Sequence, residues 1–132
     1  MRLFAFPLIL AVFGCEDETI SGYADPSATY VLEELAGVPF EARATIRFPK
    51  KGLVEADAPC NSFSAKQDAP YPWLTLGPIA ATKRACLELE AEIEFLGALQ
   101  TMGFAEVSGP VLILSSDDGV EMVFRADVSE QP

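Results

Sequence analysis

The sequence predicts an α+β fold, in which a mainly antiparallel and strongly curved sheet, or partly open barrel, has one helix packed against it. Short segments rich in strand-forming residues recur along the chain and are separated by turn-forming residues. A single stretch has helical periodicity. The order is several strands, one helix and a final hairpin, whereas a parallel sheet would need strands and helices to alternate.

The first predicted strands lie in the first half of the chain. Residues 29–35 are rich in strand formers and end just before Gly37. Residues 44–48 alternate polar and apolar side chains, which is the period of a half-buried strand. Residues 49–52, Pro-Lys-Lys-Gly, predict a hairpin turn into a further strand at 53–56.

Four more segments complete the predicted sheet. Residues 61–65 and 73–76 are the next predicted strands, and a proline-containing loop separates them. Residues 111–114 and 121–124 form the closing pair. Asp117-Asp118-Gly119 between them is a strong hairpin signal.

One helix is predicted over residues 87–102, with Gly103 just past its end. Its apolar side chains recur at helical spacing and form one stripe: Leu89, Ile93, Leu96 and Leu99. We expect this stripe to be buried against the inner face of the curved sheet, and Glu90 and Glu94 to stay exposed.

The composition excludes several classes of function. The chain has 132 residues, a net charge of −11 and no histidine. An acidic chain is poorly suited to nucleic acid or to anionic lipid surfaces. The absence of histidine removes the commonest general base and metal ligand, and excludes catalysis by Ser-His-Asp or Cys-His.

The N-terminus predicts export. Met1-Arg2 and an apolar run over residues 3–13 precede Gly14-Cys15, which describes a signal peptide. The junction resembles the bacterial lipobox, in which the cysteine is acylated and becomes the first mature residue. The run is shorter than the roughly 20 apolar residues of a membrane-spanning helix. Cleavage without lipid and a membrane anchor are the alternatives. We expect a signal peptide over residues 1–14 and a lipidated tether over 15–27.

The other two cysteines, Cys60 and Cys86, form an even pair in a chain expected to reach an oxidising compartment. A structural disulfide between them is the expected arrangement. The alternative is a redox pair of nucleophilic and resolving thiols, although the spacing is not Cys-x-x-Cys.

Two segments resemble the META-domain family, also called HslJ-like. Residues 59–64, Pro-Cys-Asn-Ser-Phe-Ser, are similar to the family's Gly-Cys-Asn-x-Phe-x-Gly segment. Residues 79–86, Ile-Ala-Ala-Thr-Lys-Arg-Ala-Cys, are similar to its Met-x-x-Thr-[Arg/Met]-x-x-Cys segment. The motif residues are Asn61, Phe63 and Thr82. Two departures are a proline in place of glycine at Pro59 and a tyrosine in place of tryptophan at Tyr30.

The resemblance implies a single domain over residues 28–128. It further implies a cracked β-barrel with a helix across its opening, and no enzyme activity. Family members are loosely linked to envelope stress and drug tolerance.

No catalytic, cofactor or metal site is expected. Ser62, Ser64 and Lys66 lack the Ser-x-x-Lys spacing of a serine–lysine dyad. Asp117 and Asp118 fit a hairpin turn better than a calcium loop, because the EF-hand spacing is absent.

These observations predict a non-enzymatic cell-envelope lipoprotein that faces the periplasm and is anchored through Cys15. Its expected role is binding or assembly with an envelope protein or an acyl chain, or stress tolerance. The alternative is a thiol-redox envelope factor that uses Cys60 and Cys86. An acyl chain would need an unfilled apolar cavity beside the helix, whereas core packing is expected for most of the aromatic residues.

Overall fold

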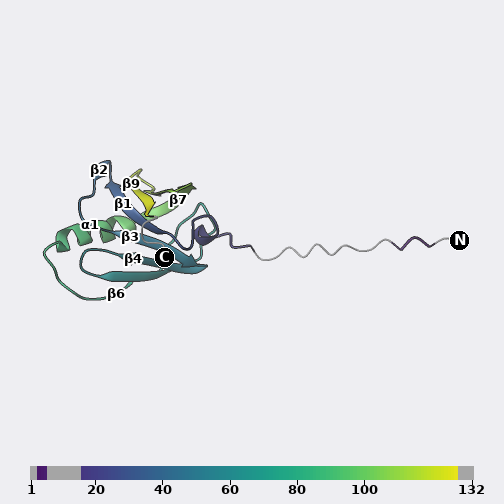
Figure 1. The fold of residues 1–132 in the computed structure, drawn as a ribbon, viewed down its shortest axis with the longest axis horizontal. Coiled ribbons are helices and arrows are strands. Elements are labelled where there is room, and N and C mark those ends of the chain that lie inside the picture. Colours follow the sequence, from purple (N-terminus) through teal and green to yellow (C-terminus); the bar gives the residue numbers. More distant parts are fainter. Residues whose placement is uncertain (1–2, 6–15, 128–132) are drawn as a thin grey trace.

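The structure is a computed structural model that describes residues 3–5 and 16–127. Nine strands, one α-helix and one short 3-10 helix make up the described part (Figure 1). Their bounds are η1 (Ile20–Gly22), β1 (Thr29–Leu35), β2 (Val38–Pro39), β3 (Thr45–Lys50), β4 (Gly52–Asp57), β5 (Ser62–Gln67), β6 (Ala80–Ala81), α1 (Leu89–Leu99), β7 (Met102–Ser108), β8 (Val111–Ser116) and β9 (Glu121–Asp127).

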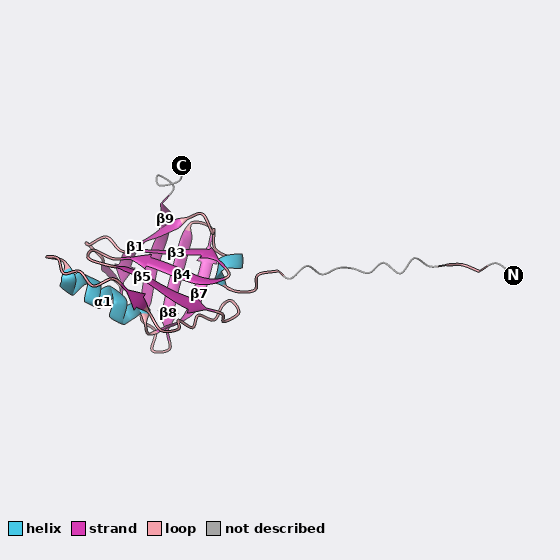
Figure 2. Ribbon diagram, turned by 90° about the horizontal axis from the view of Figure 1, so that it is seen from below, coloured by secondary structure: helices cyan, strands magenta, loops and turns pink. Residues whose placement is uncertain are grey.

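The strands form one antiparallel sheet that curls into a half-barrel, which confirms the predicted fold class. The strand order is β6-β5-β4-β3-β1-β9-β8-β7, with β2 paired to the end of β1. Every pair is antiparallel, and neighbouring strands in the sequence are joined by hairpins in β3–β4–β5 and β7–β8–β9. Figure 2 shows the curled sheet with α1 and η1 at opposite ends.

A strap of residues 71–77 links the two ends of this strand order. Trp73 forms an antiparallel bridge to Phe104 in β7, and Leu76 forms one to Gln67 in β5. Backbone hydrogen bonds from Leu74 N to Gly103 O (3.0 Å) and from Gly77 N to Lys66 O (2.9 Å) support them. The strap therefore connects β5 to β7 across the opening of the half-barrel.

The core lies inside the curl, where alternate side chains of each strand point inward. β5 and β8 show this alternation along their whole length. The largest fully buried hydrophobic side chains come from β1, β3, α1, β8 and β9 as well as η1: Ile20, Tyr30, Ile46, Phe48, Phe95, Leu112, Leu114, Met122 and Phe124. Core packing is thus the role of Phe48, Phe63, Phe95 and Phe124, as expected, whereas Trp73 is 52% exposed.

The N-terminal segment joins the core earlier than its polar sequence indicates. The sequence placed residues 15–27 in a tether, but Ile20 in η1 is only 2% exposed and belongs to the core cluster. A Cβ on Gly22 would lie 1.9 Å from the Asp17 backbone oxygen, so this turn needs glycine. The packed domain therefore begins near Thr19. The predicted lipidation site, Cys15, lies outside the described residues.

Two sequence expectations about the second half also change. α1 is shorter than predicted, because residues 87 and 88 precede it and Met102 already begins β7. β7 itself was not predicted, since Gly103 interrupts its pattern and was assigned to the end of the helix. Residues 73–76 were predicted as a strand but form the isolated bridges of the strap instead.

Candidate functional site

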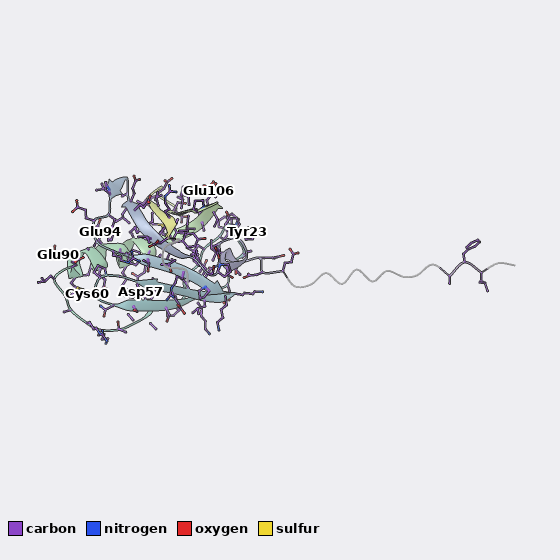
Figure 3. The ribbon with its side chains drawn as sticks, in the orientation of Figure 1. Tyr23, Asp57, Cys60, Glu90, Glu94 and Glu106 are labelled. Carbon is purple, nitrogen blue, oxygen red and sulfur yellow. A yellow bond between two sulfur atoms is a disulfide. The ribbon has the colours of Figure 1, made fainter. Side chains whose placement is uncertain are left out.

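The two motif segments and the start of α1 meet at one end of the barrel, on the side opposite the N-terminal segment. Cys60 follows β4, and Cys86 precedes α1. A disulfide joins them, with a Cα–Cα distance of 5.5 Å, so the predicted pair is present. Figure 3 places Cys60 near Glu90 and Glu94 of α1, away from Tyr23.

Asn61 is the centre of the motif cluster. Its amide nitrogen donates to the Arg84 backbone oxygen (2.9 Å) and to Glu92 Oε2 (2.6 Å). Its amide oxygen accepts from Thr82 Oγ1 (2.9 Å) and from the Arg84 backbone nitrogen (2.6 Å). An asparagine amide has two donor hydrogens and two acceptor lone pairs, so all four are in use. Asn61 thus ties both motif segments to the helix.

Glu92 completes the cluster from α1. Its side chain is buried, with the residue 4% exposed. Oε1 accepts hydrogen bonds from the backbone nitrogens of Cys60 (3.0 Å) and Asn61 (2.6 Å). Together with the Asn61 amide, these donors satisfy a carboxylate that would otherwise be costly to bury.

Sequence reasoning assigned Glu92 no role in the site. The available signal was its spacing to Phe95 and Leu99 at i+3 and i+7, which puts one acid on an otherwise apolar face.

Thr82 and Phe63 have separate structural roles. Thr82 Oγ1 accepts from the Ser62 backbone nitrogen (3.1 Å), and Thr82 N donates to Ser62 O (3.2 Å), which extends the β5–β6 pairing. Phe63 points to the other face of β5 and is buried in the core. The motif therefore combines a core anchor with a hydrogen-bonded clamp, which we call the motif clamp: Cys60, Asn61, Thr82, Cys86 and Glu92.

The helix is rotated relative to the prediction. Phe95, Leu99 and Glu92 are its buried residues, whereas Ile93 is 62% exposed. The predicted burial of Ile93 is wrong, because the hydrogen bonds to Glu92 turn that face inward and move the stripe to the side. Glu90 and Glu94 are exposed, as predicted.

This rotation leaves one apolar flank of α1 half open. Leu89, Ile93, Leu96 and Gln100 recur at i, i+4, i+7 and i+11, so they share one side of the helix and its end. Leu89 and Leu96 are only partly buried. A hollow of about 320 Å³ lies at the end of this side, lined by Leu76, Gly77, Pro78, Ile79 and Gln100. We call the first three residues, Leu89, Ile93 and Leu96, the helix flank.

The apolar interior beside the helix is nearly filled. The space lined by Val54, Phe63, Leu76, Ile79, Leu99 and their neighbours has a volume of about 10 Å³. That is about the space one water molecule needs. An acyl chain does not fit there.

A larger hollow of about 420 Å³ lies on the outer face of β3 to β6. Arg47 pairs there with Glu55 (2.7 Å) and Asp57 (3.8 Å), and Ser62 Oγ donates to Asp57 (2.6 Å). Ser64 and Lys66 are exposed on the same strand as Ser62. The polar groups that line this hollow thus bond largely to one another.

The structure also bears on three other features of the sequence: Tyr30, the turn at Asp117 and Asp118, and possible metal ligands. Tyr30, which stands where the META-domain family that the sequence resembles has tryptophan, is buried and accepts a hydrogen bond from Asp25 N (2.9 Å). Burial raises the pKa of its hydroxyl. Asp118 accepts a hydrogen bond from Ser116 within the β8–β9 hairpin. Within residues 3–5 and 16–127, no group of three or more histidine, cysteine, aspartate or glutamate residues is placed to hold a metal ion.

In the same described ranges, no helix has the length and apolar character needed to cross a membrane.

Comparisons with known proteins agree with this architecture. The family profile described as META domain matches residues 25–129. An NMR structure of a protein from Burkholderia xenovorans has a TM-score of 0.61 at 18% identity, and covers 96% of this chain and 99% of that one. A crystal structure of a DUF4847 family protein from Bacteroides vulgatus ATCC 8482 has a TM-score of 0.63 at 14% identity, and covers 80% of this chain and 96% of that one. The comparison with curated proteins found no match.

Proposed function

The chain belongs to the META domain family, and from that membership we propose that it is a non-enzymatic lipoprotein of the bacterial cell envelope that binds another envelope protein. Its anchor in this proposal is Cys15, which follows the apolar run of residues 3–13. The domain faces the periplasm, where the Cys60–Cys86 disulfide persists.

The motif clamp is the observation that supports a non-enzymatic role in this proposal. The motif residues with chemically useful groups bond to one another: Cys60 to Cys86, and Asn61 to Thr82 and Glu92. A catalytic group needs a free atom directed toward a substrate. The disulfide alone fits either role, because a thiol-redox factor holds the same bond in its oxidised form. The polar groups of Asn61, Thr82 and Glu92, however, are engaged in joining the two motif segments to each other and to α1, which supports a structural role for the motif.

A protein partner is favoured over an acyl chain. The interior cavity of about 10 Å³ gives an acyl chain no room. The helix flank, in contrast, offers Ile93 at the surface, and Leu87 is fully exposed just before α1. Glu90 and Glu94 border it on the same helix. This pattern fits a partner segment with apolar side chains next to lysine or arginine.

The anchor is tested by intact mass measurement of the native protein purified from membranes. We expect a chain that starts at Cys15 and carries acyl mass, and a Cys15→Ser variant that is released from the membrane. A mature chain that retains residues 1–14, or that lacks lipid, would contradict the anchor.

The partner is tested by a photo-crosslinking amino acid placed at Ile93 in living cells, with the same probe at exposed Glu121 on β9 as the matched control. We expect one discrete adduct from position 93 and none from 121. The adduct should disappear when Glu90 and Glu94 are both changed to lysine, because the partner's basic groups would then be repelled. An adduct that survives this change would count against the proposed contact.

A further inference from the structure

We infer that the end of the barrel opposite the motif clamp lies against the lipid surface, with the exposed rings of Tyr23 and Trp73 at the level of the headgroups. This inference rests on the proposed acylation of Cys15 and adds an orientation to it. It assigns a membrane-contact surface to four aromatic residues, Tyr23, Tyr71, Trp73 and Phe104, which we call the aromatic end.

The first argument is the short distance between anchor and core. Thr19 and Ile20 are buried, and Cys15 is only four residues before Thr19. A fully extended chain spans about 3.3–3.6 Å per residue, so about 14 Å at most separates the two Cα atoms. The headgroup layer on each side of a bilayer is roughly 5–7 Å thick. The anchored domain must therefore rest on or close to the headgroups.

The second argument is which surface surrounds that exit point. The Glu18 backbone oxygen, directly before the buried turn, accepts a hydrogen bond from Tyr71 N (2.7 Å). Tyr23 stacks on Tyr71 with ring centroids 4.1 Å apart. Figure 3 places Tyr23 on the side of the N-terminal segment, and Cys60, Glu90 and Glu94 at the other end. The aromatic end thus adjoins the residues closest to the anchor.

The third argument is that two of these rings, Tyr23 and Trp73, are exposed and are held in place by the half-buried rings of Tyr71 and Phe104. Trp73 packs on Phe104 with centroids 4.7 Å apart, and Tyr71 Oη accepts from Val107 N (2.9 Å) in β7. Tyr23 is 54% exposed and Trp73 is 52% exposed. Tryptophan and tyrosine favour the membrane interface, because each has an apolar ring and a polar group.

Charge does not drive the contact. Lys50 and Lys51 are exposed near the turn of the β3–β4 hairpin, and Lys51 lies close enough to Asp17 to act on its carboxylate. Glu16 and Glu18 lie at the same end and oppose these cations. The rings therefore provide the attraction, and the contact should survive high salt.

Trp73 is the only tryptophan of the chain, so its fluorescence reports on this surface alone. The experiment uses the mature lipidated protein, which begins at Cys15, on vesicles of phosphatidylethanolamine and phosphatidylglycerol with brominated lipids. The matched control is a Trp73→Phe, Val38→Trp variant, because Val38 is exposed on β2 next to α1. We expect Trp73 emission to shift to shorter wavelength and to be quenched several-fold more than the control tryptophan.

The outcomes separate the two proposals. Protein that floats with the vesicles while Trp73 is quenched no more than the control would overturn the orientation and leave the anchor intact. Protein that does not float would overturn the anchor, and the orientation with it. A Trp73 shift that needs added envelope protein rather than lipid would assign the aromatic end to a protein partner and overturn the inference.

Discussion

Glu92 shows how one side chain can set the orientation of a whole element. Its carboxylate is enclosed by two backbone nitrogens and the Asn61 amide. Since these partly buried donors would otherwise lose their partner, the position favours an acceptor at this site. The acid is therefore a structural residue of the motif clamp.

We predict that Glu92→Ala destabilises the domain by about 1–3 kcal/mol, since it leaves the partly buried donors of Cys60 and Asn61 without their acceptor. Urea unfolding of purified protein measures this. Glu90→Ala is the matched control, because Glu90 is exposed on the same helix, and it should change the stability by about 0.5 kcal/mol or less. Equal shifts in the two variants would show that the enclosure of Glu92 does not contribute.

Asp17 gives the N-terminal turn a dependence on pH. Burial raises the pKa of its carboxyl, but hydrogen bonds donated by Ser21 and Thr19 outweigh this and hold the pKa below its ordinary value of 3.8. The stabilisation is therefore fully present above that ordinary value, and it is lost as the pH falls through the lower folded-state pKa.

We predict that Asp17→Asn lowers the stability near neutral pH and reduces the loss of stability on acidification below about pH 4. Unfolding midpoints in urea at several pH values, compared between wild type and variant, measure the difference. Asp118→Asn is a useful comparison in a hairpin far from this turn. A wild-type acid sensitivity that Asp17→Asn leaves unchanged would exclude this carboxylate as its source.

At the scale of elements, α1 shows what hydrophobic periodicity can predict about a helix and what it cannot. The spacing of Leu89, Ile93, Leu96 and Leu99 identified the helix, but not the face that is buried. That face depends on donors from residues 60 and 61, more than 30 positions earlier in the chain. No local pattern contains such a contact. The spacing of Glu92 to Phe95 and Leu99 could have placed this acid on the apolar face, but its hydrogen-bond partners could not be read from the sequence.

The strands were more predictable, because alternation and turn chemistry are local. The hairpins at Gly52 and Gly119 were both anticipated, and both glycines have positive φ. β7 was missed since its pattern is interrupted at Gly103, and the strap was assigned to a strand since it contains Trp73-Leu74-Thr75-Leu76. At the candidate site, the disulfide, Asn61 and Thr82 were predicted, and Glu92 was not.

We predict that Phe95→Ala costs about 3–5 kcal/mol, because the ring is fully buried under the curl of the sheet. Ile93→Ala, two residues earlier on the opposite side of the helix, should cost about 0.5 kcal/mol or less, because Ile93 is 62% exposed. Thermal melts of both variants measure the contrast. If Ile93→Ala were the more destabilising of the two variants, the helix would instead bury the apolar stripe that its sequence predicts.

At the scale of the whole molecule, the domain is held at both ends. The motif clamp fastens α1 to β4 and β5, and the strap fastens β5 to β7. The strap alone crosses the opening of the sheet, where it bridges to one residue of β5 and one of β7. Because unpaired strand edges invite association with other chains, these bridges cover part of the edges that the opening exposes.

We predict that Cys60→Ser destabilises the domain by about 3–4 kcal/mol in the chain-entropy treatment of a loop of this length. The two cysteines are 26 residues apart. Unfolding with and without reductant measures the effect, and reductant should not alter the variant further. If complete reduction left the stability of the wild-type protein unchanged, the disulfide would not contribute to the stability of the fold.

The burial of Ile20 also determines how the molecule carries a mechanical load. A pull applied at residue 16 reaches the Glu18–Tyr71 hydrogen bond after two residues and the core side chain after four. There is no slack linker to absorb the strain. Under such a pull, we expect η1 to be extracted first, which would expose the core around Ile20 while the motif clamp at the far end stays intact.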